Sequence, residues 1–254
     1  MAELVYPPVV AFARTIFKVL GLRITVEGAE HIPRSGGAVL AANHVSYLDF
    51  ALNGLVVLPS RRRIRYMAKD AVFRNPVAGP LMRGMHHIPV NRSAGAGAFD
   101  EAVAALKSGE IVGVFPEATI SRAFALKDFK TGAARMAVAA DVPLIPMATW
   151  GAQRIYTKGR RPSPGRGKAV ALAVGEPFRP APGADPAQVT AELKQRIADL
   201  LAGLQERYPQ RPAGNDDRWW VPAAAGGSAP TLEEAREMDA ADAAGRARRP
   251  PNQS

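Results

Sequence analysis

His44 and Asp49 are the residues of this 254-residue chain whose types and spacing most directly suggest catalysis. They lie in the segment NHVSYLD, which follows the apolar run 38–42. A carboxylate that accepts a hydrogen bond from one imidazole nitrogen fixes the tautomer and leaves the other nitrogen available as a base. Because a spacing of five puts two side chains about 140° apart on a regular helix, the pair meets more readily where a strand turns into a helix. The segment therefore predicts a general base; its simpler interpretation is an acidic capping box formed by Ser46 and Asp49.

A second polar segment, VFPEATISR, also follows an apolar run, at 111–115. Glu117 supplies a carboxylate, and Thr119, Ser121 and Arg122 supply hydrogen-bond donors. Ligands of α/β sheets bind at the ends of the strands, so the segment is a candidate half of a binding site. Taken alone, it is equally typical of an ordinary turn that ends a strand.

The elements that must position these residues are short strands that alternate with helices. Apolar runs predict strands at residues 22–26, 38–42, 64–68, 87–90, 111–115, 144–150 and 169–174. Helical periodicity predicts helices at residues 5–20, 47–57, 71–85, 97–107, 131–140 and 186–208, the third of them interrupted by proline. Such alternation indicates an α/β domain.

Four segments together resemble the motifs of the glycerolipid acyltransferases, specifically the 1-acyl-sn-glycerol-3-phosphate acyltransferase family. The pattern from His44 to Asp49 is similar to motif one, and FPE at 115–117 to motif three. GMHHIPVNR, which ends at Arg92, is similar to motif two, and VPLIP at 142–146 to motif four. The likeness covers roughly residues 20–205. It implies a mixed sheet flanked by helices.

The resemblance implies acyl transfer from a thioester to an alcohol. His44 would remove the proton of the hydroxyl, and Asp49 would orient the ring and stabilise the imidazolium. Arg92 would bind an acceptor phosphate, because a guanidinium matches two phosphate oxygens. Glu117 would order either the acceptor or this arginine. The implied acceptor is 1-acyl-sn-glycerol 3-phosphate, the product is phosphatidic acid, and the co-substrate is acyl-CoA or acyl carrier protein, with no other cofactor.

The third motif departs from the usual FPEGTRS, because Ala118 replaces the glycine and Ile120 the arginine. This departure leaves other acceptors open, namely glycerol 3-phosphate, a lysoglycolipid or a polyol. Lys69, Lys130 and Arg122 are further candidates for phosphate binding, and each is equally compatible with a solvated surface charge.

The charge of the chain favours anionic partners. Of its 33 basic and 23 acidic residues, 5 and 7 lie in residues 214–254, so residues 1–213 hold 28 and 16 and carry a net charge of +12. Nucleic acid, an anionic membrane surface and a phosphorylated substrate would all be attracted. Because we find no helix-turn-helix, RNP or zinc pattern, we expect no nucleic acid. The arginine run at 61–65 could meet anionic lipid, coenzyme A phosphates or an acidic carrier protein.

Residues 1–21 are expected to form an amphipathic, membrane-associated helix. Val9, Phe12 and Ile16 form an apolar stripe, and Arg14 and Lys18 lie on the opposite side. Alternatively, the stripe packs on the domain. Stretches without charged residues are too short to span a bilayer, so we expect peripheral or monotopic attachment at the cytoplasmic face of the cell membrane. A non-catalytic membrane adaptor of the same fold is a further alternative.

The absence of cysteine excludes disulfides, thiolate metal sites and a cysteine nucleophile. His86 and His87 do not indicate a metal site, because adjacent residues of a strand point to opposite faces. We assign residues 22–213 to the acyltransferase domain. Residues 214–254, rich in Gly, Ala, Pro and charge, are expected to form a poorly ordered tail, anchored by Trp219 and Trp220.

Overall fold

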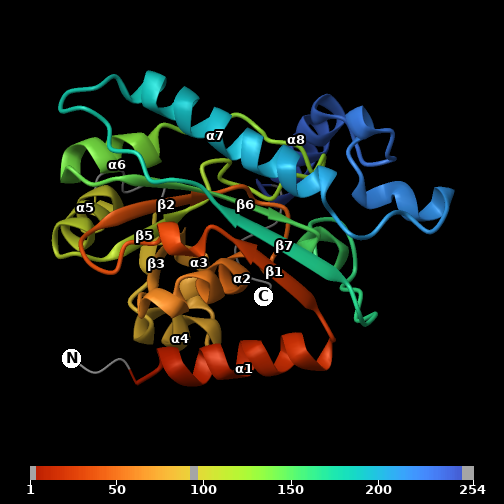
Figure 1. Cartoon of the computed structure of the whole chain (residues 1–254), viewed down its shortest axis with the longest axis horizontal. Coiled ribbons are helices and arrows are strands. Elements are labelled where there is room, and N and C mark those ends of the chain that lie inside the picture. Colours follow the sequence, from red (N-terminus) through yellow and green to blue (C-terminus); the bar gives the residue numbers. More distant parts are fainter. Residues whose placement is uncertain (1–3, 92–96, 248–254) are drawn as a thin grey trace.

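The structure is a computed structural model, which describes residues 4–91 and 97–247. Its centre is a seven-stranded sheet with the strand order β1-β7-β6-β2-β5-β3-β4 (Figure 1). The strands are β1 (Arg23–Glu27), β2 (Ala38–Ala42), β3 (Ile64–Lys69), β4 (Ile88–Val90), β5 (Ile111–Val114), β6 (Leu144–Trp150) and β7 (Ala169–Val174). Each agrees with a predicted strand to within one residue at either end.

The sheet is mixed, as the resemblance implied. Strand β7 runs antiparallel to β6 and parallel to β1, and the other neighbouring strands of the sheet are parallel. From β2 the chain crosses to β3, beyond β5, whereas from β5 it crosses to β6, beyond β2. The segments that leave β2 and β5 therefore diverge. In open α/β sheets, ligands bind in the crevice that such divergence leaves at the carboxyl ends of the strands.

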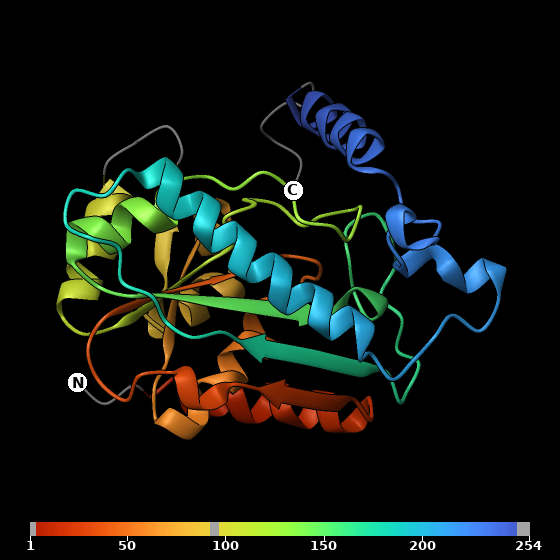
Figure 2. The ribbon, with the colours of Figure 1, turned by 45° about the horizontal axis from the view of Figure 1, so that its top comes forward.

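Helices cover both faces of the sheet (Figures 1 and 2). The α-helices of the described residues are α1 (Tyr6–Val19), α2 (Asp49–Val56), α3 (Asp70–Arg74), α4 (Ala78–Gly84), α5 (Gly97–Lys107), α6 (Gly132–Ala140), α7 (Pro186–Glu206) and α8 (Leu232–Ala247). Leu40 and Ala42 of β2 pack in a core with α1 and α2, whereas Val39 and Ala41 pack with α5, α6 and α7. Because successive side chains of a strand face opposite sides, β2 is buried on both faces.

The stretch 71–85, predicted as one interrupted helix, forms two short helices, α3 and α4. Pro76 lies in the break, where Asn75 accepts hydrogen bonds through its side-chain oxygen from the N–H groups of Val77 and Ala78. Asn75 is the C-cap residue of α3, and its side chain makes a turn of the kind that asparagine favours between the two helices. None of the described helices is both long and apolar enough to cross a membrane.

The C-terminal segment differs from the poorly ordered tail that its composition predicted. Residues Asn215–Trp220 form a 3₁₀ helix, and α8 follows (Figure 2). Trp220 is 3% exposed and packs with Trp150 and Tyr208, so the predicted tryptophan anchor is present. Composition underestimates order here because the partners of this segment come from distant parts of the chain.

Candidate active site

His44 and Asp49 meet at the junction between β2 and α2. His44 Nδ1 lies 2.9 Å from Asp49 Oδ2, and the histidine side chain is 20% exposed whereas the aspartate is fully buried. The imidazole also stacks on the ring of Phe115 with a centroid separation of 4.1 Å. With Nδ1 on the carboxylate, Nε2 is the ring nitrogen that can accept a proton. The predicted pairing of the two side chains is therefore present.

Asp49 is held by the backbone that precedes it. Its Oδ2 accepts hydrogen bonds from the N–H groups of Val45 (2.7 Å) and Ser46 (2.8 Å) as well as facing the imidazole. Helix α2 begins at Asp49, so the capping-box interpretation, with Ser46 as the N-cap residue, is corrected. Instead, the Ser46 hydroxyl donates to the carbonyl of Tyr156 (2.6 Å) and accepts from the N–H of Leu48 (3.1 Å).

The loop after β5 wraps around His44. Glu117 Oε1 accepts from the His44 N–H (2.8 Å), and the N–H of Ser121 donates to the His44 carbonyl (2.7 Å). Glu117 Oε2 accepts from the N–H of Lys127 (3.0 Å). Glu117 is 4% exposed, and both of its oxygens bind backbone groups. In this position it fixes the histidine loop and the loop after β5 to each other. Its predicted role of ordering the acceptor or Arg92 stays a prediction.

Burial dominates the acidity of Glu117. Desolvation raises the pKa of its carboxyl to about 7, against the lowering effect of the hydrogen bonds from the His44 and Lys127 backbones and of the Lys127 charge. The charge of Asp49 raises this pKa further. The Glu117 carboxyl therefore has a pKa near neutral pH.

A cavity of about 930 Å³ opens beside His44. Its wall is mainly apolar and is built by α1, α2, α3, α4 and the segment 114–120. The apolar lining includes Val9, Phe12, Ile16, Phe17, Leu48, Phe50, Val72, Leu81, Met82, Phe99 and Met136. A volume of this size with few polar groups is typical of a site for an organic ligand.

Some of the predicted substrate-binding residues line the cavity, and others do not. Lys69 and Lys130 line the cavity. Arg122 points elsewhere, to carboxylates of α8, so it does not take the place of the missing motif arginine in the cavity wall. Arg92 lies outside the described residues.

Two features of the site were not predicted from the sequence: Lys158, and the hydrogen-bond network beside His44 and Asp49. Lys158 lines the cavity but belongs to the loop after β6, outside the four motifs. Asn43 exchanges two hydrogen bonds with the Thr149 backbone (3.0 and 2.7 Å), and the Thr149 hydroxyl donates to Asn53 Oδ1 (2.9 Å). Asn43 directly precedes the histidine, which was the available signal for this network; for Lys158 there was none.

The two departures from the third motif have structural consequences. Ala118 adopts φ 61°, a left-handed conformation in which glycine is favoured. Ile120 is 4% exposed and forms part of the cavity wall. The position at which the family places an arginine is therefore occupied by a buried apolar side chain.

The paired histidines of motif two have separate positions. His86 is exposed, whereas His87 is buried and accepts a hydrogen bond through Nδ1 from the N–H of Tyr66 (3.1 Å). His87 thus connects the segment before β4 to β3. Within residues 4–91 and 97–247, no cluster of three His, Asp or Glu side chains could hold a metal ion.

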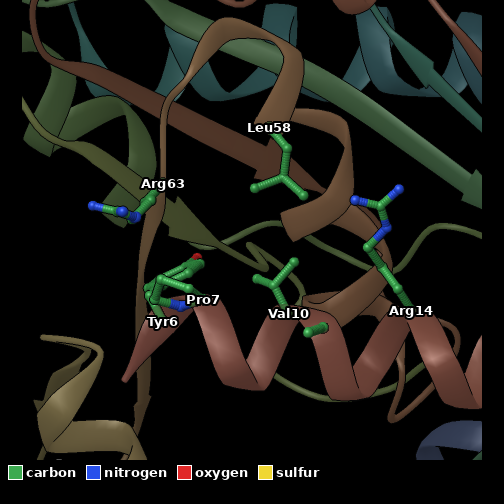
Figure 3. Close-up of a pocket in the computed structure, with 7 residues that line it drawn as sticks. Tyr6, Pro7, Val10, Arg14, Leu58 and Arg63 are labelled. Carbon is green, nitrogen blue, oxygen red and sulfur yellow. The ribbon is translucent and has the colours of Figure 1, made fainter. Parts of the chain in front are cut away.

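A second, shallower pocket of about 380 Å³ lies between α1 and residues 58–63 (Figure 3). Tyr6, Val10, Arg14 and Leu58 are among its lining residues. It holds no histidine or carboxylate, so it offers no general base. Of these two pockets, the cavity beside His44 is the one whose lining includes a candidate general base.

The acyltransferase family profile matches residues 23–150, from the start of β1 to the end of β6. The chain belongs to the acyltransferase family. This acyltransferase is 32% identical over 204 residues to the 1-acyl-sn-glycerol-3-phosphate acyltransferase of Bacillus subtilis (strain 168), an alignment that covers 78% of this chain and 94% of that relative. It is 35% identical over 152 residues to the 1-acyl-sn-glycerol-3-phosphate acyltransferase alpha of Mus musculus, covering 58% of this chain and 52% of the mouse protein.

A solved structure shares the fold of the acyltransferase. The crystal structure of the 1-acyl-sn-glycerophosphate acyltransferase from Thermotoga maritima matches with a TM-score of 0.68 and 24% sequence identity, over 80% of each chain. The family resemblance drawn from the four motifs is thus confirmed, and the protein is an O-acyltransferase.

Proposed function

We propose that this acyltransferase transfers a fatty acyl group from an acyl thioester to the free hydroxyl of 1-acyl-sn-glycerol 3-phosphate, giving phosphatidic acid for phospholipid biosynthesis. The observation that carries the proposal is the pair of His44 and Asp49 in the wall of a large apolar cavity. The printed names of the relatives from Bacillus subtilis and Mus musculus support this acceptor.

His44 acts as the general base in the proposed reaction. Nε2 takes the proton of the acceptor hydroxyl while the hydroxyl oxygen attacks the carbonyl carbon of the thioester. The C–S bond then breaks, the ester forms, and the imidazolium returns the proton to the leaving thiolate. Asp49 stabilises the imidazolium through Nδ1, and the stacked Phe115 ring limits rotation of the imidazole. The acyl group passes directly to the acceptor without an acyl-enzyme intermediate.

The apolar wall of the cavity suits the hydrocarbon chains of both substrates. Lys69 and Lys130 lie in the same wall and can attract phosphate groups. The donor is acyl-CoA or an acylated carrier protein. Part of the arginine run considered for this partner is engaged within the domain: Arg62 donates to the carbonyls of Gly36 and Gly109, and Arg65 donates to that of Met85.

We also propose that the protein attaches peripherally or monotopically to an anionic membrane surface, at the cytoplasmic face. The α1 stripe supports this: Phe12 is 68% and Val19 61% exposed, while Phe17 packs into the core. Further exposed apolar side chains, Phe50 and Val77, belong to helices or segments that border the cavity. Such a rim would let a lipid acceptor enter from the interface without crossing water.

The test is acyl transfer from palmitoyl-CoA and oleoyl-CoA to 1-acylglycerol 3-phosphate on detergent micelles. Wild type should form phosphatidic acid, and His44→Ala should lower turnover by about 10²- to 10⁴-fold because the general base is lost. Thermal unfolding of both proteins provides the folding control. A folded wild type with no transfer to this acceptor would contradict the proposal.

A second acceptor class has one observation in its favour. The buried Ile120 removes a cation from the cavity wall, which would suit an acceptor without a phosphate, such as a polyol or lysoglycolipid. Parallel assays with glycerol 3-phosphate, 1-acylglycerol and a lysoglycolipid, all with palmitoyl-CoA, distinguish these acceptors. Higher kcat/KM with 1-acylglycerol than with its 3-phosphate would favour the neutral class.

A further inference from the structure

Three cations from the loops around the active site converge on two carboxylates of α8. Arg122 donates to Asp242 (2.6 Å) and Asp239 (3.3 Å), and Lys127 donates to Asp239 (2.9 Å). Lys158 donates to Asp239 and lies 3.5 Å from Asp242. The three cations are between 10% and 19% exposed. We call Arg122, Lys127 and Lys158 the basic triad.

The basic triad borders the catalytic cavity. Lys158 lines the cavity directly, and Lys127 donates to the hydroxyl of Thr119 (2.6 Å), which also lines it. Lys158 is held near the catalytic pair by the preceding residue, since the Thr157 hydroxyl donates to the Val45 carbonyl (2.7 Å). The triad is therefore fixed to the same loops that hold His44 and Asp49.

Charge and geometry make the triad suitable for a phosphate group. Three positive charges face two carboxylates, so one positive charge stays uncompensated within this cluster. A phosphomonoester carries about −1.5 to −2 charges at neutral pH and offers three oxygens to such donors. The carboxylates of Asp239 and Asp242 thus occupy the positions that phosphate oxygens would take.

Helix α8 is attached in a way that permits exchange. Of its apolar side chains, Ala235 is buried, whereas Leu232 and Met238 are exposed, so the ion pairs supply much of its attachment. Thr231 and Glu234 form a capping box, with the Thr231 N–H 2.7 Å from the Glu234 carboxylate, that stabilises α8 internally. The chain before α8 stays anchored through Trp220 and Ala229, which are buried. Figure 2 shows α8 outside the layers that cover the sheet.

We propose that the basic triad binds the phosphate of a substrate, and that Asp239 and Asp242 of α8 are displaced when it does so. The triad would supply positive charge beside the cavity, at positions other than that of the missing motif arginine. The inference rests on the proposed function for its substrate, and the phosphate has two sources: the acceptor, 1-acylglycerol 3-phosphate, or the donor, coenzyme A. The two sources are separated by measuring the KM of each substrate with the other at saturation.

The first experiment compares Lys158→Met with Lys107→Met, a matched control that removes an exposed lysine of α5. Lys158→Met should raise the KM for 1-acylglycerol 3-phosphate about 10-fold, since one charged hydrogen bond is lost, and leave kcat within about twofold. Lys107→Met should leave both constants unchanged. A rise confined to the KM for acyl-CoA would assign the site to the donor. Equal constants for Lys158→Met and wild type would overturn the proposal.

The second experiment removes the internal competitor. The double variant Asp239→Asn, Asp242→Asn should lower the KM for the phosphate-bearing substrate severalfold, whereas Lys158→Met raises it. With 1-acylglycerol, which lacks the phosphate, neither variant should change the acceptor KM. Opposite shifts that depend on the phosphate are not expected from a merely structural contact, so a shift of equal size with both acceptors would contradict the inference.

A third readout needs no turnover, and so separates this inference from the proposed reaction. Hydrogen exchange of the α8 amides is measured in the full chain with glycerol 3-phosphate, with coenzyme A, and with glycerol as the uncharged control. Displacement predicts faster exchange over residues 232–247 with one of the phosphate ligands and no change with glycerol. Unchanged exchange with both phosphate ligands at saturating concentration would overturn displacement, whatever the catalytic assays show.

Discussion

The loops that follow β2 and β5 leave the same ends of two neighbouring parallel strands. Their charged side chains nevertheless find partners at very different distances along the sequence. The β2 loop places His44 and Asp49 five residues apart and holds the carboxylate with backbone N–H groups from the same turn. The β5 loop places Arg122 and Lys127 against carboxylates of α8, more than 100 residues away in sequence. The comparison shows that the His44–Asp49 pair is fixed by its own turn, whereas the charged rim is assembled from segments far apart in the sequence.

Asp49→Asn should show the largest effect, because it changes the locally fixed group. An amide cannot stabilise the imidazolium as a carboxylate does, and its NH₂ group would oppose donors that now face Oδ2. We expect kcat to fall about 10³-fold, in the range typical of such pairs. Steady-state kinetics beside thermal unfolding checks this; a fall below about tenfold in a folded variant would remove Asp49 from the mechanism.

Trp220→Ala sharpens the comparison within the C-terminal segment. Truncating a buried aromatic side chain should lower the free energy of unfolding by about 3–5 kcal/mol. Removing α8 by ending the chain after Pro230 should lower it by about 1–2 kcal/mol, because ion pairs near the surface contribute little each. Urea unfolding of both variants measures the difference. Equal losses in the free energy of unfolding would show that α8 contributes as much to stability as the buried Trp220 side chain.

Glu117 links the two loops, and its titration predicts the pH dependence of their stability. Its pKa is about 7 in the folded protein, against an ordinary value of 4.5. Between these values the folded state binds more protons, so the contribution of Glu117 is present below pH 4.5 and is lost as pH rises through 7. The loss amounts to about 3 kcal/mol at most.

Urea unfolding of wild type and Glu117→Gln between pH 4.5 and 8 tests this contribution. The free energy of unfolding of wild type should decline with pH more steeply than that of the variant, which lacks the titrating group. Parallel curves would show that Glu117 keeps an ordinary pKa. Because Gln can accept fewer hydrogen bonds than a carboxylate, a constant offset between the curves is expected and does not bear on the slope.

Ala118→Gly should have the smallest effect. At φ 61° an alanine costs about 1–2 kcal/mol, and glycine avoids this cost while losing about 0.5–1 kcal/mol through the greater freedom of the unfolded chain. The net gain should lie between about 0 and 1.5 kcal/mol. Ala139→Gly in α6 is the matched control and should destabilise by about 1 kcal/mol. Destabilisation by both substitutions, measured by thermal unfolding, would contradict the strain assigned to Ala118.

Much of the fold could be predicted from sequence because strands β2, β5, β6 and β7 are continuous apolar runs, which are buried along their whole length. Residues 38–42 and 144–150 form strands with the predicted ends. The break at Asn75 was less predictable, since proline within a helical pattern signals an interruption but not where each half ends.

The candidate site likewise has features that could be predicted from the sequence and features that could not. His44 and Asp49 could be paired from sequence because the turn between a strand and a helix is local. The backbone partners of Glu117 could not be predicted from the sequence, because they depend on how two loops meet across adjacent strands. The position of Arg122 was equally undetermined: its guanidinium binds α8, in a segment whose composition predicted little order.

The sequence by itself determined the α/β architecture, the pairing of His44 with Asp49 and the family resemblance, because these depend on apolar periodicity and on residues a few positions apart. The tertiary structure alone decided that Glu117 faces backbone groups, that Lys158 reaches the cavity, and that Asp239 and Asp242 meet the basic triad. Electrostatic contacts between segments far apart in the chain leave no local sequence pattern. Which charges become partners is therefore settled when strands and loops from distant parts of the chain come together.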